Sequence, residues 1–81
     1  IQSIKSKEIY IGYSGNLKKR IMQHNTNKSF STKNKGPWAL IYYEAYRSKD
    51  NALEREHRLK YYGRALAHLK RRLDKSLLMP D

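Results

Sequence analysis

The sequence predicts an α+β fold, in which a small antiparallel sheet of two to three strands is flanked by about three helices. Two short β-prone segments near the start are separated by a polar turn, which is typical of a hairpin. A longer apolar run at residues 38–46 predicts a further strand. Apolar residues recur at helical spacing at residues 17–25, before residue 62 and at residues 64–77.

Length and composition limit the architecture. The 81 residues predict a single domain, residues 1–81, with a modest core, because a short chain buries a limited share of its surface. There is no cysteine, which excludes disulfides and thiolate zinc sites, and the three histidines are scattered. The core must therefore come from leucine, isoleucine and aromatic residues, which include seven tyrosines and one tryptophan.

The charge points to the partner. The formal net charge is +11, from 18 basic and 7 acidic residues. This excess favours nucleic acid, because Lys and Arg displace counterions from phosphates. No stretch is long and apolar enough to span a membrane, and no secretion signal is present, so we expect no membrane partner. The alternative is that the charge serves solubility alone.

The first strands are short. Residues 1–4 are predicted to be the end of a strand. Residues 8–12 are predicted to form the next, with Ile9 and Ile11 on one face and Tyr10 on the other. The polar residues between them predict a turn, so the two segments form an antiparallel hairpin.

The first helix is predicted at residues 17–25, with Asn16 as its N-cap and Asn25 in the left-handed conformation at its end. Residues 26–36 are rich in Ser, Thr, Asn and Lys and predict a long basic loop. Because residues 38–46 are almost continuously apolar, we expect a central strand that is covered on both faces.

Two more helices are predicted after this strand. The second begins at a cap formed by Ser48 or Asp50 and runs to about Tyr62, with Gly63 ending it. The third, residues 64–77, is amphipathic, and its outer face is basic. The leucines of its inner face are Leu66, Leu69, Leu73 and Leu77. The last three residues are expected to fray.

Two basic side chains lie on the apolar face of the first helix. At about 100° per residue, Arg20 and His24 share one sector with Leu17 and Ile21. A buried guanidinium is costly unless it meets an anion. Each residue also has a structural explanation. For Arg20, the alternative to an anion ligand is a side chain whose stem packs on Leu17 and whose guanidinium reaches solvent. His24 is alternatively a structural histidine with a satisfied hydrogen bond.

The second helix also carries a charged side chain on its apolar face, in this case a carboxylate. Glu56 lies on the apolar face with Ala52 and Leu59. It is either an ion-pair partner of Arg20 or Lys60, or a metal ligand or general acid or base in a cleft.

Phosphodiester hydrolysis is a chemistry that suits this set of residues: the inward-facing Arg20, His24 and Glu56, and Tyr10 near Gly12. Arg stabilises charge on phosphate. One carboxylate can hold a hard divalent ion, and Tyr or His can take or relay a proton. The sequence has no P-loop, dinucleotide fingerprint, or serine or cysteine triad motif.

These residues resemble a known family. Tyr10-Ile11-Gly12, followed by Asn16-Leu17, Arg20 and His24-Asn25, is similar to the second half of the GIY-YIG nuclease signature. Further matches downstream are Ser31-Thr32, Gly36-Pro37-Trp38, the strand from Leu40 to Glu44, Ala52-Leu53-Glu54-Arg55-Glu56, and Lys60. The pattern resembles the small single-domain bacterial branch, which is similar to the N-terminal domain of excision-repair nucleases.

The resemblance implies a small antiparallel sheet flanked by helices. It also implies a metal-dependent endonuclease that hydrolyses the backbone of DNA, branched or structured DNA included. One Mg²⁺ or Mn²⁺ ion would be the cofactor, with no small-molecule cofactor, and DNA repair in the cytoplasm would be the setting. By the resemblance, Tyr10 is the tyrosine of the second triplet, Arg20 the phosphate-binding arginine, His24 the helix histidine and Glu56 the metal ligand.

The sequence departs from the family at its start. The first triplet of the family lies on the strand that precedes the hairpin turn, and residues 1–3 resemble the tail of that strand. The tyrosine of that triplet is absent, so we expect an N-terminally truncated domain or a different mechanism. Tyr10, Tyr13 and His24 are the poor substitutes available as proton acceptors.

Two other functions are kept open. A non-catalytic nucleic-acid-binding module of the same fold would use the same basic surface, and a protein-interaction domain would use charge for solubility. The sequence predicts no oligomeric state. The side chains predicted to contact nucleic acid are Lys19, Lys28, Lys33, Lys35, Lys60, Lys70 and Arg71.

Overall fold

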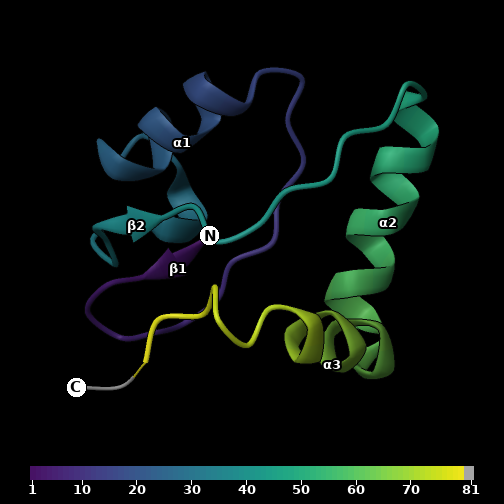
Figure 1. The fold of residues 1–81 in the computed structure, drawn as a ribbon. Coiled ribbons are helices and arrows are strands. Elements are labelled where there is room, and N and C mark those ends of the chain that lie inside the picture. The colour runs from purple at the N-terminus through teal and green to yellow at the C-terminus, as the bar shows by residue number, and fades with distance from the viewer. Residues whose placement is uncertain (80–81) are drawn as a thin grey trace.

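The computed structural model describes residues 1–79 and consists of three α-helices and a two-stranded antiparallel sheet, which confirms the predicted α+β fold (Figure 1). Residues 80–81, which belong to the end predicted to fray, lie outside the described part. The elements in order are β1 (Gln2–Ser3), α1 (Leu17–Asn25), the 3-10 helix η1 (Phe30–Thr32), β2 (Trp38–Ala39), α2 (Lys49–Tyr61) and α3 (Gly63–Arg72).

The sheet is built around β1. In the antiparallel register of β1 and β2, Gln2 pairs with Ala39 and Ser3 with Trp38. On its other side Gln2 forms an isolated bridge with Ile9, and the Ser3 amide donates to the Glu8 carbonyl at 2.8 Å. The predicted hairpin is therefore present, but the predicted strand at residues 8–12 is reduced to one bridge.

The predicted central strand at residues 38–46 is wrong beyond Ala39. The pairing with β1 ends at Ala39, opposite Gln2, and no residue from 40 to 48 forms a β-bridge with a described residue. A strand needs a neighbour for its backbone donors and acceptors, so residues 40–46 continue without regular secondary structure and residues 47–48 form a bend before α2. The two-faced covering predicted for this run is also wrong, because Leu40 and Tyr43 are exposed.

The first helix has the predicted bounds and the predicted N-cap. The Asn16 side chain accepts from the Lys19 amide at 3.1 Å. The predicted helix end is wrong in one detail: Asn27, with φ 59°, is the left-handed residue. The Asn25 side chain instead accepts from the Trp38 amide at 2.6 Å and donates to the Trp38 carbonyl at 3.1 Å. It thereby ties α1 to β2.

The second helix begins at one of the two predicted caps, because the Ser48 hydroxyl accepts from the Asn51 amide at 3.4 Å. The predicted role of Gly63 is wrong, since Gly63 opens α3 and no described glycine has positive φ. The chain turns between the helices at Tyr62, whose extended backbone has φ −117° and ψ 97°.

The third helix is shorter than predicted and ends at Arg72, after which residues 73–76 form turns. Its predicted apolar face is confirmed. Leu69 is buried, and Leu66, Leu73 and Leu77 are half-buried.

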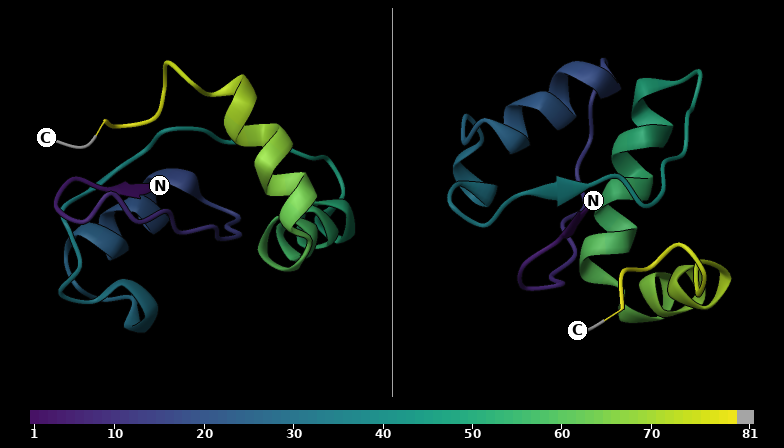
Figure 2. Two further views of the ribbon diagram at one scale, coloured as in Figure 1. Left: turned by 90° about the horizontal axis from the view of Figure 1, so that it is seen from below. Right: turned by 60° about the vertical axis from the view of Figure 1, so that its left-hand side comes forward.

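The elements fall into two groups. Figures 1 and 2 show α1, η1 and the sheet on one side, α2 and α3 on the other, and the extended segments 10–16 and 40–48 between them. Among the residues described, only Trp38, Leu59 and Leu69 are buried apolar side chains, which confirms the modest core. None of the helices within residues 1–79 has the length and apolarity to cross a membrane.

Candidate active site

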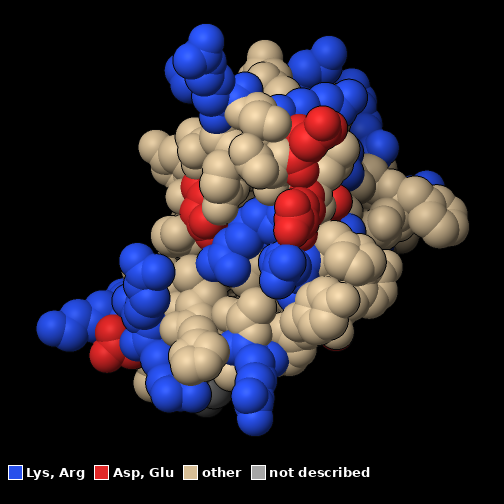
Figure 3. All heavy atoms as spheres, turned by 90° about the vertical axis from the view of Figure 1, so that its right-hand side faces the viewer, with Lys and Arg blue, Asp and Glu red and all other residues tan. Residues whose placement is uncertain are grey.

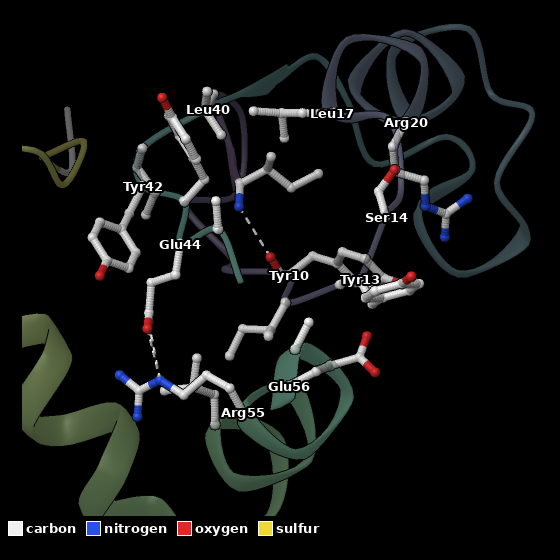
Figure 4. Close-up of a pocket in the computed structure, with 18 of the residues that line it drawn as sticks. Tyr10, Tyr13, Ser14, Leu17, Arg20, Leu40, Tyr42, Glu44, Arg55 and Glu56 are labelled. Atoms are coloured by element: carbon white, nitrogen blue, oxygen red, sulfur yellow. Dashed lines mark hydrogen bonds and ion pairs between the residues drawn. The ribbon is translucent and has the colours of Figure 1, made fainter. Parts of the chain in front are cut away.

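A cavity of about 540 Å³ lies between the two groups of elements (Figure 4). All four side chains predicted to be catalytic line it. Tyr10 comes from the segment after the bridge, Arg20 and His24 from α1, and Glu56 from α2. The structure therefore brings together, at one cavity, residues that lie up to 46 positions apart in the chain.

The Tyr10 ring lies close to several other side chains of the site. Its ring centroid lies 4.9 Å from that of His24 and 6.4 Å from that of Trp38, and the Lys60 Nζ lies 5.6 Å from it. A Cβ on Gly12 would approach the Tyr10 Cε1 to 3.0 Å. A side chain at position 12 would therefore displace the Tyr10 ring, while the backbone there, whose φ is not positive, does not itself call for glycine.

His24 is buried, with 2 % of its surface exposed, and its Nδ1 lies 2.5 Å from the Thr32 Oγ1. Burial first, and then the positive charge of Arg20, lower the pKa of His24 below its ordinary value of 6.5. The structure thus gives His24 the satisfied hydrogen bond of a structural histidine while keeping the ring neutral at the cavity wall.

We expect Thr32→Val to lower the free energy of unfolding by about 1–3 kcal/mol, because it leaves the buried His24 Nδ1 without its partner. Urea unfolding followed by circular dichroism measures this. Ser31→Ala is the matched control, since Ser31 is exposed one residue away. Equal losses in the two variants would mean that the hydrogen bond to His24 contributes nothing specific.

The lowered pKa of His24 also predicts a pH dependence of stability. Below about pH 6.5 His24 is protonated in the unfolded chain but stays neutral in the folded chain. The free energy of unfolding therefore falls as the pH decreases from 6.5 towards the lowered pKa. In His24→Gln this part of the slope should disappear. Urea unfolding between pH 5 and 7.5 tests it, with exposed His68→Gln as control. A slope that persists in His24→Gln would contradict the prediction.

Arg20 has an unusual environment. Its Nη1 donates to the Gln23 Oε1 at 3.3 Å, whereas its Nε is buried and has no hydrogen-bond partner among the described residues. The side chain as a whole is half-buried. A buried donor without an acceptor costs about 1–3 kcal/mol. Arg20 is therefore better suited to receive an anion than to stabilise the fold.

Glu56 has one of the two ion-pair partners predicted for it. Its Oε2 lies 3.5 Å from the Lys60 Nζ, one helical turn away, and 23 % of its side chain is exposed. No ion pair with Arg20 is present in the described part of the chain. Partly exposed pairs of this kind contribute about 0–1 kcal/mol, so Lys60 does not hold the carboxylate firmly.

The donor set restricts the kind of metal that fits. No group of three or more His, Cys, Asp or Glu side chains within residues 1–79 is placed to hold an ion. A single half-buried carboxylate such as Glu56 suits an ion that keeps its waters and takes phosphate oxygens as further ligands, as Mg²⁺ does. It does not suit zinc, which requires three or four protein ligands.

The cavity also contains a second charged pair, Glu44 with Arg55, which the sequence did not predict. The Arg55 Nε donates to the Glu44 Oε2 at 2.9 Å (Figure 4). The Tyr46 hydroxyl donates to the Glu44 Oε1 at 2.7 Å. Burial raises the pKa of Glu44, but these hydrogen bonds and the charge of Arg55 outweigh it and lower the pKa below its ordinary value. The available signal was that Glu44 is the only charged residue of the apolar run 38–46.

The side chains predicted to bind nucleic acid are all exposed, but they form two groups. Lys19 lies on α1, and Lys28, Lys33 and Lys35 lie before and after η1. On the other side of the cavity are Lys60 on α2 and Lys70 and Arg71 on α3. Figure 3, which views the molecule from the side of α2 and α3, shows Lys and Arg atoms spread across that face.

Comparison with known proteins supplies the family. The family model of the GIY-YIG catalytic domain matches residues 1–65. The chain is 37 % identical over 65 residues to a UPF0213 protein of Staphylococcus haemolyticus, covering 79 % of each chain. It is 31 % identical over 61 residues to a UPF0213 protein of Oceanobacillus iheyensis, covering 74 % of this chain and 71 % of that protein.

A UPF0213 protein of Clostridium perfringens is 36 % identical over 61 residues, covering 74 % of this chain and 66 % of that protein. No solved structure matches the chain. The family match spans the segment that holds Tyr10, Arg20, His24 and Glu56. The chain belongs to the GIY-YIG family of nucleases, which act on nucleic acids.

Proposed function

We propose that this chain is the catalytic domain of a divalent-metal-dependent endonuclease that hydrolyses phosphodiester bonds of DNA. One observation carries the proposal: Arg20 and Glu56 reach from α1 and α2 towards the same end of one cavity (Figure 4). An arginine with an unpartnered donor and a weakly paired carboxylate are a complementary pair for a phosphate and its cation.

Arg20 is the phosphate ligand in this proposal. Its buried Nε lacks an acceptor, and an oxygen of the scissile phosphate would supply one. A guanidinium offers several donors in a fixed plane, which matches a phosphate group. Because the donors are already in place, they stabilise the negative charge that grows on the phosphate during hydrolysis.

Glu56 is the ligand of the divalent ion, Mg²⁺ or Mn²⁺. Its partial exposure and its single weak ion pair leave both oxygens within reach of the cavity. When bound, the ion would neutralise phosphate charge and acidify a bound water. Lys60, released from Glu56 by the ion, would remain beside Tyr10 as a cation for a neighbouring phosphate.

Tyr10 and His24 are the groups that would take or relay the proton. His24 stays neutral, as its lowered pKa requires. In the tautomer whose Nδ1 donates to the Thr32 hydroxyl, its Nε2 is an acceptor. The ring of Tyr10 contacts the imidazole, which positions both groups at the same wall of the cavity.

The basic side chains complete the proposal. Lysines around η1 and the basic residues of α2 and α3 flank the cavity on two sides, so a DNA backbone crossing it would meet positive charge on both. Each phosphate neutralised releases counterions, which makes binding favourable and dependent on salt.

The test is turnover. Plasmid DNA incubated with the protein and Mg²⁺ or Mn²⁺ should be cleaved, and EDTA should stop cleavage without stopping binding. The alternative is a non-catalytic binding module, in which Glu56 keeps its ion pair with Lys60 and holds no metal ion. Binding without cleavage in either ion would establish that alternative.

A further inference from the structure

We propose that the C-terminal end of α2 carries a base-stacking platform, formed by His57, Tyr61 and Tyr62, that binds unpaired nucleotides of the DNA substrate. This inference rests on the proposed function and adds the class of substrate to it. The substrate would be DNA with a single-stranded segment next to the position of cleavage.

The three rings form one contiguous cluster on the surface. The ring centroids of His57 and Tyr61 lie 4.8 Å apart, and those of His57 and Tyr62 lie 6.0 Å apart. Tyr61 is 71 % exposed and Tyr62 is 57 % exposed, so the rings contact one another rather than the core. Exposed, preformed aromatic faces of this kind are what a nucleic-acid base stacks on.

The cluster lies next to the candidate active site. His57 and Tyr61 each follow by one residue the Glu56–Lys60 pair that borders the cavity, about 100° further around the helix. Lys60 reaches from the same turn to the ring of Tyr10 at 5.6 Å. A strand whose phosphate lies between Arg20 and Glu56 would therefore bring its neighbouring nucleotides to the aromatic stripe.

The charge around the cluster selects a nucleic acid as the occupant. Arg58, Lys60 and Arg64 are close to it in sequence. Arg58 is paired with Glu54 and Lys60 with Glu56, whereas Arg64 has no ion pair in the part of the chain that the structure describes. The whole chain has a net charge of +11, so it attracts a polyanion rather than a second copy of itself. Within a duplex the base faces are already stacked, so exposed rings favour unpaired bases.

The experiment compares two double variants by fluorescence anisotropy in EDTA, where no turnover occurs. Tyr61→Leu with Tyr62→Leu keeps apolar bulk and removes the aromatic faces, whereas Tyr61→Phe with Tyr62→Phe keeps them. Against a single-stranded oligonucleotide, the leucine variant should bind at least about fivefold more weakly and the phenylalanine variant within about twofold of the unmodified protein. Binding to the duplex of the same sequence should change in neither variant.

A leucine variant that binds the single strand normally, or that loses single strand and duplex equally, overturns the platform. A second measurement does not depend on variants: irradiating the protein with a bromodeoxyuridine oligonucleotide should attach it at His57, Tyr61 or Tyr62. Attachment only at other positions overturns the proposal too. Because both measurements are made without turnover, loss of the platform and loss of cleavage are separate results.

Discussion

Replacing Glu56 by alanine is expected to abolish metal-dependent cleavage of DNA while DNA binding stays intact. In the proposed function, Glu56 is the carboxylate that holds the divalent ion at the cavity. Losing that ion removes several kcal/mol of transition-state stabilisation, so the rate should fall at least ~1000-fold. Binding should be unchanged or slightly tighter, because Lys60 loses its carboxylate partner and can contact a phosphate.

The chain offers a matched control for this prediction. Glu54, on the solvent-facing side of α2, forms an ion pair of the same i,i+4 spacing, with its Oε1 3.0 Å from the Arg58 Nη2. Both side chains of this pair are exposed. Glu54→Ala should leave cleavage within about twofold, since an exposed pair contributes little. Cleavage that survives Glu56→Ala, or that falls equally in Glu54→Ala, would remove Glu56 from the proposed site.

Arg20→Ala is expected to lower the cleavage rate by about 10²–10³-fold, because it removes donors placed for the charge that develops on phosphate. Lys18→Met is the control for a lost cation on the same helix, since Lys18 is exposed and outside the predicted contacts. Single-turnover cleavage at saturating protein separates the rate from any weaker binding.

Arg20→Met adds a readout that a merely structural arginine would not show. The Nε of Arg20 is buried without an acceptor, so removing it should raise the free energy of unfolding by about 1 kcal/mol while activity is lost. Urea unfolding measures this. A variant that loses both stability and activity would indicate that Arg20 supports the fold and does not serve the phosphate.

Local features of the chain were predictable because their physics is local. The caps of α1 and α2 each involve a side chain and an amide three residues on, Asn16 with Lys19 and Ser48 with Asn51. Helical periodicity likewise placed Arg20 and Glu56 on inward stripes before any partner was known. The family motif residues lie at those same positions.

The strands and one helix end were not predictable in this way. Residues 40–46 have strand-forming side chains, but a strand exists only where a neighbouring strand satisfies its backbone groups. Among the described residues, the observed pairing with β1 ends at Ala39. Gly63 has the residue type of a helix terminator, yet it begins α3 because the break occurs one residue earlier at Tyr62.

By itself the sequence determined the family, the positively charged surface, the inward positions of Arg20, His24 and Glu56, and the α+β class. Only the tertiary structure decided the contacts between elements: Thr32 is the partner of His24, and the Arg20 Nε has no partner within residues 1–79. The pair of Glu56 with Lys60 lies within α2, and the sequence already offered Lys60 as one of two partners. The physical reason is that periodicity sets the direction of a side chain on its own helix. The distance to a group on another element depends on how the elements pack.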